Sequence, residues 1–149
     1  MEIPNEDIPL GRFFGELAKE YGGILTHSLE HLPINRYFDA LLIIDNYRGD
    51  LSQTTLGEEL HLDKASVVRM LDYLEQNKCI KRCPNPLDRR AHILQLTDKA
   101  SEMIPDIKQA TRNANLACLK KLPGRNITDF EAELESVLQS LQSETKRNY

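Results

Sequence analysis

The sequence predicts a mainly helical fold that carries one small β-hairpin, and three observations lead to this prediction. Apolar residues recur every three or four positions over most of the chain, as they do along amphipathic helices. Two short helical stretches follow one another across a tight turn near the middle of the chain. A cluster of proline and asparagine residues then separates two short segments, which indicates a hairpin of two strands.

The first two helices are predicted from apolar spacing and from residues that favour helix ends. Apolar residues at helical spacing run from Leu10 to Leu32, and Pro33 is expected to end this helix. Asn35 is expected to cap the second helix, which should stop near Gly49.

The middle of the chain predicts a helix-turn-helix followed by the hairpin. Ser52 should cap the first short helix and Asp63 the second, because both side chains accept hydrogen bonds from backbone N–H groups at helix starts. The second helix should end around Asn77, and the strands are expected at 79–83 and 91–96. The apolar face of the second helix consists of Val67, Leu71 and Leu74.

Two long helices are predicted after the hairpin. Thr97 should cap the first of them, which contains Pro105 and is therefore expected to bend or to begin late. Thr128 and Glu131 have capping-box spacing, so Thr128 is expected to cap the last helix.

Length and charge bound the class of protein. One domain is expected over residues 1–149, with the helix-turn-helix and hairpin at about 35–100 and flanking helices at 8–32 and 98–143. The net charge of −4 disfavours a protein that coats nucleic acid indiscriminately. Residues 64–99, however, hold eight basic and four acidic residues, which is the local excess that a phosphate-facing surface needs.

Several other classes are disfavoured. The three cysteines match no zinc-ligand spacing, and His27 and His31 share a helix face without further ligands, so we expect no metal and no cofactor. The start of the chain lacks the features of a signal peptide and no run of about 18 apolar residues exists, which predicts a cytoplasmic protein without a membrane span. Without a Gly-rich phosphate loop or a nucleophile motif, we expect no enzyme activity.

The second central helix presents small and basic residues on the face opposite its apolar stripe. The expected DNA contacts on this helix are Lys64, Ala65, Ser66, Val68 and Arg69. In the major groove, Arg69 would address guanine or phosphate, Ser66 would bond to either, and Val68 would touch a thymine methyl group. The alternative is an ordinary solvated helix face. The exposed Val68 beside Ala65 favours a DNA-contacting face over this alternative.

The hairpin tip carries Asp88, Arg89 and Arg90, after a strand that contains Lys81 and Arg82. A narrow minor groove concentrates negative potential and attracts arginine. Asp88 is expected to hold an arginine in a fixed orientation through a bidentate pair. The alternative is a surface salt bridge without function, which contributes about 0–1 kcal/mol.

These segments together resemble the MarR family of bacterial regulators. The matching stretch is 51–100, LSQTTLGEELHLDKASVVRMLDYLEQNKCIKRCPNPLDRRAHILQLTDKA, in unbroken order. Its most specific positions are Asp88, Arg89, Arg90, Leu96, Thr97 and Lys99. The resemblance implies a winged helix-turn-helix transcription regulator that binds double-stranded DNA, in many members as a repressor.

The resemblance also implies roles for individual residues and an oligomeric state. Arg90 would enter the minor groove, Asp88 would orient it, and Arg89 would contact phosphate. The start of the first helix-turn-helix helix is expected to contact DNA through Ser52, Gln53 and Thr54. A homodimer formed by the first and the last two helices would present two recognition helices to a pseudo-palindromic operator.

The sequence departs from the family pattern at a few positions. Ala65 and Val68 stand where the family has Ser or Thr, so methyl contacts are expected to replace hydrogen bonds. His61 occupies a turn position that Gly usually holds, and His adopts left-handed conformations more readily than most residues. Lys78 stands where Gly is frequent, and the neighbouring Asn77 is expected to take the left-handed conformation.

Sensing and competing functions are the remaining expectations. Family members often release DNA when a phenolic or other aromatic molecule binds, and the candidate pocket residues, which also have core-like spacing, are Phe14, Tyr21, Tyr37 and Phe38. A redox-sensing regulator is an alternative, with Cys83 beside Arg82 as its thiol, whereas Cys79 and Cys118 are interpreted as core residues. The family's peroxide sensors place their cysteine in the first helix, where this chain has none. A winged-helix protein-interaction module without DNA binding is a further alternative.

Overall fold

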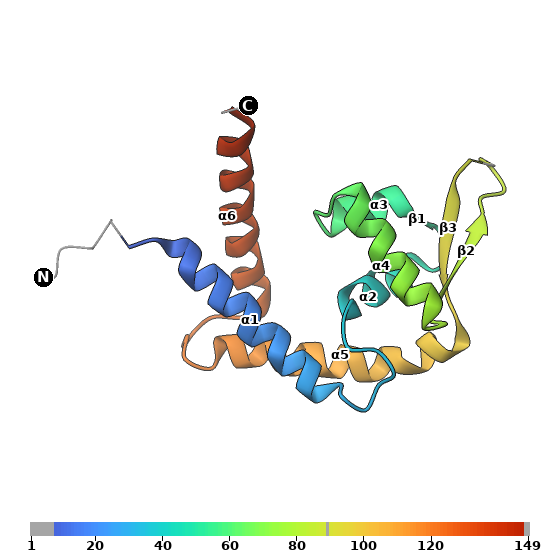
Figure 1. Ribbon diagram of the computed structural model, residues 1–149. Helices are drawn as coiled ribbons and strands as arrows, with labels where there is room; N and C mark the ends of the chain where they lie inside the picture. Colours follow the sequence, from blue (N-terminus) through green and yellow to red (C-terminus); the bar gives the residue numbers. More distant parts are fainter. Residues whose placement is uncertain (1–7, 89, 148–149) are drawn as a thin grey trace, which may run out of the picture. The chain divides into compact units, whose positions relative to one another are not determined.

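Helices and one small sheet make up the computed structural model, which describes residues 8–88 and 90–147, and this confirms the predicted fold class (Figure 1). The chain divides into two compact units, Met1–Ala110 and Thr111–Tyr149. The elements are α1 (Leu10–Ser28), α2 (Phe38–Tyr47), β1 (Leu51–Ser52), α3 (Gln53–Glu59), α4 (Lys64–Gln76), β2 (Ile80–Pro84), β3 (His92–Leu96), α5 (Asp98–Leu119) and α6 (Ile127–Arg147).

The sheet is antiparallel, with its strands in the order β1-β3-β2. β2 and β3 form the predicted hairpin, in which Ile80 lies opposite Leu96. β1 pairs with the other edge of β3, where Leu51 lies opposite Leu94. Sequence reasoning missed β1 because a strand of two residues shows no alternation.

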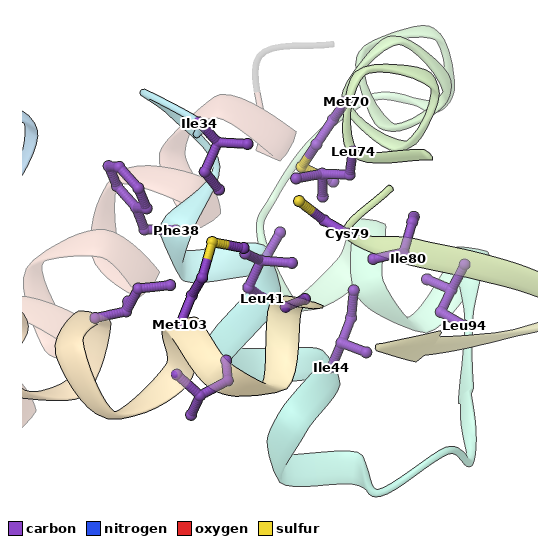
Figure 2. Packing of buried hydrophobic residues seen from close by; sticks show 14 of the residues in the cluster. Ile34, Phe38, Leu41, Ile44, Met70, Leu74, Cys79, Ile80, Leu94 and Met103 are labelled. Carbon is purple, nitrogen blue, oxygen red and sulfur yellow. The ribbon is translucent and has the colours of Figure 1, made fainter. Parts of the chain in front are cut away.

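The core of the first unit lies where α2, α4, the sheet and α5 meet (Figure 2). Leu41, Leu71, Leu94 and Ile107 are fully buried there, one from each of these elements. No described residue of α1 or α6 is buried. The helix-turn-helix and its wing therefore have a core of their own, whereas α1 and α6 keep their apolar faces exposed.

Three predicted helix caps are confirmed. Ser52 Oγ accepts a hydrogen bond from Thr55 N at 3.0 Å, and Asp63 Oδ1 accepts one from Ser66 N at 2.9 Å. Thr97 Oγ1 accepts a hydrogen bond from Ala100 N at 3.2 Å at the start of α5, and this helix continues through Pro105.

Two predicted features at the start of the chain are wrong. α1 ends at Ser28 rather than at Leu32, since Leu29 leaves the helix and is buried in the core with 1% exposure. Asn35 does not cap α2, which begins at Phe38; its side chain instead accepts a hydrogen bond from Tyr73 Oη at 3.1 Å. A tertiary contact with α4 has thus replaced the local cap.

The predicted cap of α6 is also wrong. Asn126, rather than Thr128, caps the helix, since its Oδ1 accepts a hydrogen bond from Asp129 N at 3.0 Å. Asn126 and Thr128 both lie near the start of α6, so either could cap its first turn. Asn is a somewhat better N-cap than Thr.

The end of α4 corrects the prediction for its left-handed residue. Lys78 has φ +57°, whereas Asn77 has φ −82° and uses its side chain to donate to Tyr73 O at 2.8 Å. Cys79 N donates to Leu74 O at 2.8 Å and Lys78 N to Glu75 O at 2.9 Å, the two bonds of a Schellman motif. Lys78 therefore occupies the position that Gly usually holds.

Candidate nucleic-acid interface

The exposed face of α4 carries most of the predicted recognition residues. Val67, Met70, Leu71 and Leu74 are buried against the core. The predicted contacts that remain exposed are Lys64, Ala65, Val68 and Arg69, with Ser66 half-buried beside them. This face combines two cations with a β-branched side chain that is 37% exposed, so it offers both charge and methyl groups.

Hydrogen bonds link three side chains along this face of α4. Ser66 Oγ donates to Asp63 Oδ2 at 2.6 Å, and Arg69 Nη2 donates to Ser66 Oγ at 2.9 Å. The bonds from Ser66 hold the pKa of Asp63 below its ordinary value, with a smaller contribution from the charge of Arg69. The Ser66 hydroxyl, which we expected to contact DNA, is thus hydrogen-bonded to Asp63 and Arg69.

The turn that joins α3 to α4 brings the two helices very close. His61 takes the left-handed conformation predicted for it, with φ +51°. A Cβ atom on Gly57 would lie 2.9 Å from Val67 Cγ2, so the close approach requires glycine there. At the start of α3, Thr54 is exposed while Gln53 and the capping Ser52 are half-buried.

The wing tip is built on Asx-type hydrogen bonds. Asn85 Oδ1 accepts from Leu87 N at 2.9 Å, and Asp88 Oδ1 accepts from Arg90 N at 2.9 Å. Asp88 thus accepts a hydrogen bond from the backbone of Arg90, and the side chain of Arg90 is exposed. Arg89 lies outside the described residues.

Arg82 has a role that sequence reasoning missed. We counted it among the basic residues of the wing, but its guanidinium pairs with Asp72 Oδ1 at 2.6 Å and Glu75 Oε2 at 3.0 Å, both on α4. Its side chain is only 23% exposed. The signal that was available is the three-residue spacing of Asp72 and Glu75, which puts both carboxylates on one helix face.

A second set of contacts ties the end of α4 to the start of α5. Lys99 Nζ donates to Asn77 O at 2.7 Å, and Thr97 Oγ1 donates to Lys78 O at 2.7 Å. A cation at the carbonyl end of a helix interacts favourably with the helix dipole. Together with Arg82, these bonds fix α4 relative to the sheet.

A cleft of about 330 Å³ lies beside the loop between α1 and α2. It is lined by Thr26, Glu30, Leu32, Pro33, Ile34, Asn35 and Tyr73. None of the four predicted pocket residues lines it. Phe38 is a core residue with 5% exposure, Phe14 is exposed on α1, and Tyr21 and Tyr37 are half-buried.

An aromatic and cationic cluster adjoins this cleft through Tyr73. The rings of Tyr37 and Tyr73 meet edge to face with centroids 5.4 Å apart, and the Arg36 guanidinium lies 4.3 Å from the Tyr73 centroid. Tyr37 is held at φ +64°, a strained conformation for a bulky residue, which shows that the surrounding contacts determine it.

The cysteines occupy three different environments. Cys79 is buried, as expected, and burial raises the pKa of its thiol, which disfavours the reactive thiolate. Cys118 is exposed on α5, so its interpretation as a core residue is wrong. Cys83 is half-buried, and its thiol donates to Gln95 Oε1 at 3.5 Å, while the neighbouring Arg82 is occupied by the two carboxylates of α4.

The histidines of the α1 region pair with carboxylates. His27 lies 3.6 Å from Glu30, and His31 Nε2 lies 2.8 Å from Asp106 Oδ2. Across residues 8–88 and 90–147, no three His, Cys, Asp or Glu side chains gather in a way that would hold a metal ion. In the same ranges, no helix has the length and apolar character needed to cross a membrane.

The fold and the interface define a winged helix-turn-helix protein: a capped helix with an exposed basic face beside a hairpin with an exposed arginine. The chain is similar to the MarR family, whose family model matches residues 32–91.

Solved structures are similar over nearly the whole chain. A mutant of MarR from E. coli complexed with operator DNA has a TM-score of 0.77 and 26% identity, covering 93% of this chain and 99% of that one. The transcriptional repressor CouR bound to a 23-mer DNA duplex has a TM-score of 0.70 and 26% identity, covering 95% and 98%. The transcriptional regulator SlyA has a TM-score of 0.79 at 17% identity, covering 95% and 100%, and shows the shared fold.

Proposed function

We propose that this protein is a transcription regulator that binds double-stranded DNA in a sequence-specific manner. The observation that carries the proposal is the exposed face of α4 with Lys64, Val68 and Arg69, next to a wing whose tip exposes Arg90. Two similar proteins of the same fold were solved with DNA bound, which supports this reading. Arginine and lysine side chains read base edges in the major groove through hydrogen bonds, and apolar side chains do so through contact with the thymine methyl group.

In the proposed complex, each element has a distinct role. α4 enters the major groove, where Arg69 reads a base and Val68 contacts a thymine methyl group, with Lys64 toward phosphate. The start of α3 contacts the backbone through Thr54 and the neighbouring Ser52 and Gln53. The wing places Arg90 in the minor groove, and Asp88 holds the wing turn from which Arg90 projects. Arg89 is proposed as a phosphate contact.

The variant Arg90→Ala tests the proposed wing contact. The operator is first recovered by genomic pull-down and sequencing, and affinity is then measured by fluorescence anisotropy at several salt concentrations. We expect affinity to fall about tenfold and the slope of log K against log salt to decrease by about one for each protomer on the operator, because each protomer loses one cation that displaces counterions. Lys146→Ala, an exposed cation in the last turn of α6, is the matched control and should change neither quantity.

The salt series also separates the proposal from its rival. If Arg90→Ala keeps the wild-type affinity and slope, the wing does not enter the groove. If the wild-type protein retains no genomic fragment and binds no duplex in dilute buffer, the winged-helix module is a protein-interaction domain instead.

We further propose that the regulator is a homodimer. α1 exposes a row of large apolar side chains, and α6 exposes another; they are Leu10, Phe13, Phe14 and Leu17 on α1, and Leu134, Val137, Leu138 and Leu141 on α6. Leaving that much apolar surface in water is costly, and a second copy of the chain would cover it. Twofold symmetry would then match a pseudo-palindromic operator.

We also propose that the protein represses transcription until an aromatic molecule occupies the cleft beside Tyr73. Among the described residues, Glu30 is the only acidic side chain that lines the cleft, and no lysine or arginine lines it. The cleft therefore favours a neutral phenol or a cationic aromatic molecule over an aromatic carboxylate. Phenol and benzylamine should release bound operator at lower concentrations than salicylate, and Glu30→Gln should narrow the difference. If the three compounds are equally potent on the wild type and on Glu30→Gln, the cleft is excluded as the binding site of the effector.

A further inference from the structure

We propose that Ser66 is a positioning residue for Arg69: its hydroxyl, held by Asp63, fixes the guanidinium in the orientation that reads a base in the major groove. This inference rests on the proposed function, because it assigns a role within the same interface. It replaces the sequence expectation in which Ser66 contacted DNA itself.

The direction of each hydrogen bond follows from the chemistry of the groups. An ionised carboxylate only accepts, so the single proton of the Ser66 hydroxyl is donated to Asp63 Oδ2, 2.6 Å away. The lone pairs of Ser66 Oγ are then free to accept, and Arg69 Nη2 donates to them at 2.9 Å. Both bonds of Ser66 therefore point one way along the helix, from arginine to serine to aspartate.

This arrangement leaves Arg69 prepared for DNA. A guanidinium has five N–H donors, and the bond to Ser66 uses one of them, so enough remain for a bidentate contact with guanine. A long exposed side chain normally loses rotamer freedom on binding, and holding it beforehand reduces that cost. The Ser66 hydroxyl has no second proton to offer, so it is not available as a donor to phosphate.

Capping of the helix is separable from the positioning of Arg69. The cap uses Asp63 Oδ1 and the backbone N of Ser66, at 2.9 Å. Ser66→Ala keeps both of these atoms and removes only the hydroxyl between Asp63 and Arg69. Alanine is also a better helix former than serine, so this variant should fold as the wild type does.

A double-mutant cycle on the recovered operator tests the inference, with wild type, Ser66→Ala, Arg69→Ala and the double variant. We expect Ser66→Ala to weaken operator binding about three- to tenfold and to relax the preference at the base pair that Arg69 reads. In the Arg69→Ala background, Ser66→Ala should have no further effect. Binding of Ser66→Ala to a duplex of unrelated sequence should match that of the wild type.

Controls separate this inference from fold and from the proposed function. Ser101→Ala, an exposed serine near the start of α5, should leave binding unchanged. Asp63→Asn retains a good N-cap, but its amide nitrogen cannot accept the Ser66 proton, so the hydroxyl is no longer held in place and the preference at the base pair that Arg69 reads should relax as in Ser66→Ala.

Each other outcome of the cycle overturns the inference. An equal loss from Ser66→Ala in both backgrounds would mean that Ser66 contacts DNA directly. An unchanged affinity and base preference in Ser66→Ala, with operator binding by the wild type intact, would mean that Arg69 needs no support. If the wild type binds no duplex, the proposed function itself fails, and the inference fails with it.

Discussion

Single residues decide where the helices of the proposed DNA-binding face begin and how its side chains are arranged. Ser52 and Asp63 start α3 and α4 because a short oxygen-bearing side chain reaches the N–H group three residues later. Asp63 also accepts the Ser66 hydroxyl, so one carboxylate supports both the helix and its exposed face. Its protonation state therefore matters to both.

The lowered pKa of Asp63 predicts a contribution to stability that acid removes. A carboxyl whose pKa is depressed in the folded state stabilises the protein above the pKa of the unfolded chain, and this contribution disappears as pH falls through the folded pKa. Urea unfolding of the wild type and of Asp63→Asn should therefore differ by a constant amount above about pH 5 and converge as pH falls through the folded pKa of Asp63. A difference that stays the same over this range would contradict the assignment.

At the scale of elements, ion pairs and close packing fix the wing and α3 against α4. Arg82 on β2 holds Asp72 and Glu75 of α4, and the glycine at position 57 lets α3 approach Val67. The wing and the recognition helix would contact different grooves of one duplex, so their relative position determines whether both fit.

Replacing the guanidinium of Arg82 should weaken the attachment of the wing to α4. Arg82→Met keeps an apolar stem of similar length but breaks both ion pairs, and we expect the free energy of unfolding to fall by about 1–2 kcal/mol. The loss is limited because Asp72 and Glu75 are partly exposed and become hydrated, and because Arg82 Nε is buried without a hydrogen-bond partner among the described residues.

A neighbour on the same strand provides the control for Arg82. Lys81 is exposed, so Lys81→Met should change stability by no more than about 0.5 kcal/mol. Urea denaturation of the three proteins measures both values. An equal and small effect of the two substitutions would show that the ion pairs do not hold the wing.

For the whole molecule, the exposed apolar faces of α1 and α6 lead to the proposed dimer. In α6, Leu134, Val137, Leu138 and Leu141 follow helical spacing along one stripe, and each is at least 40% exposed. A single chain with these faces uncovered would be prone to associate, and a twofold partner removes them from water.

A charge in the stripe of α6 should break the dimer. Leu138→Glu would place a carboxylate in the proposed apolar interface, and we expect a monomer in sedimentation at micromolar concentration, with operator affinity reduced at least tenfold because one half-site is lost. Ser136→Glu adds the same charge to the opposite side of α6 and should remain dimeric. A wild-type protein that sediments as a monomer would exclude the proposal.

The helix-turn-helix, the wing, and the caps at Ser52, Asp63 and Thr97 could be predicted from the residues alone, because they depend on apolar spacing and on hydrogen bonds within a few residues. The partners of Arg82 and Asn35 could not be predicted in this way, since each side chain bonds to a residue that is distant in sequence and is brought close by folding. Local sequence rules indicate which nearby groups a side chain can bond to. Tertiary packing determines the partner when a distant residue competes with these groups.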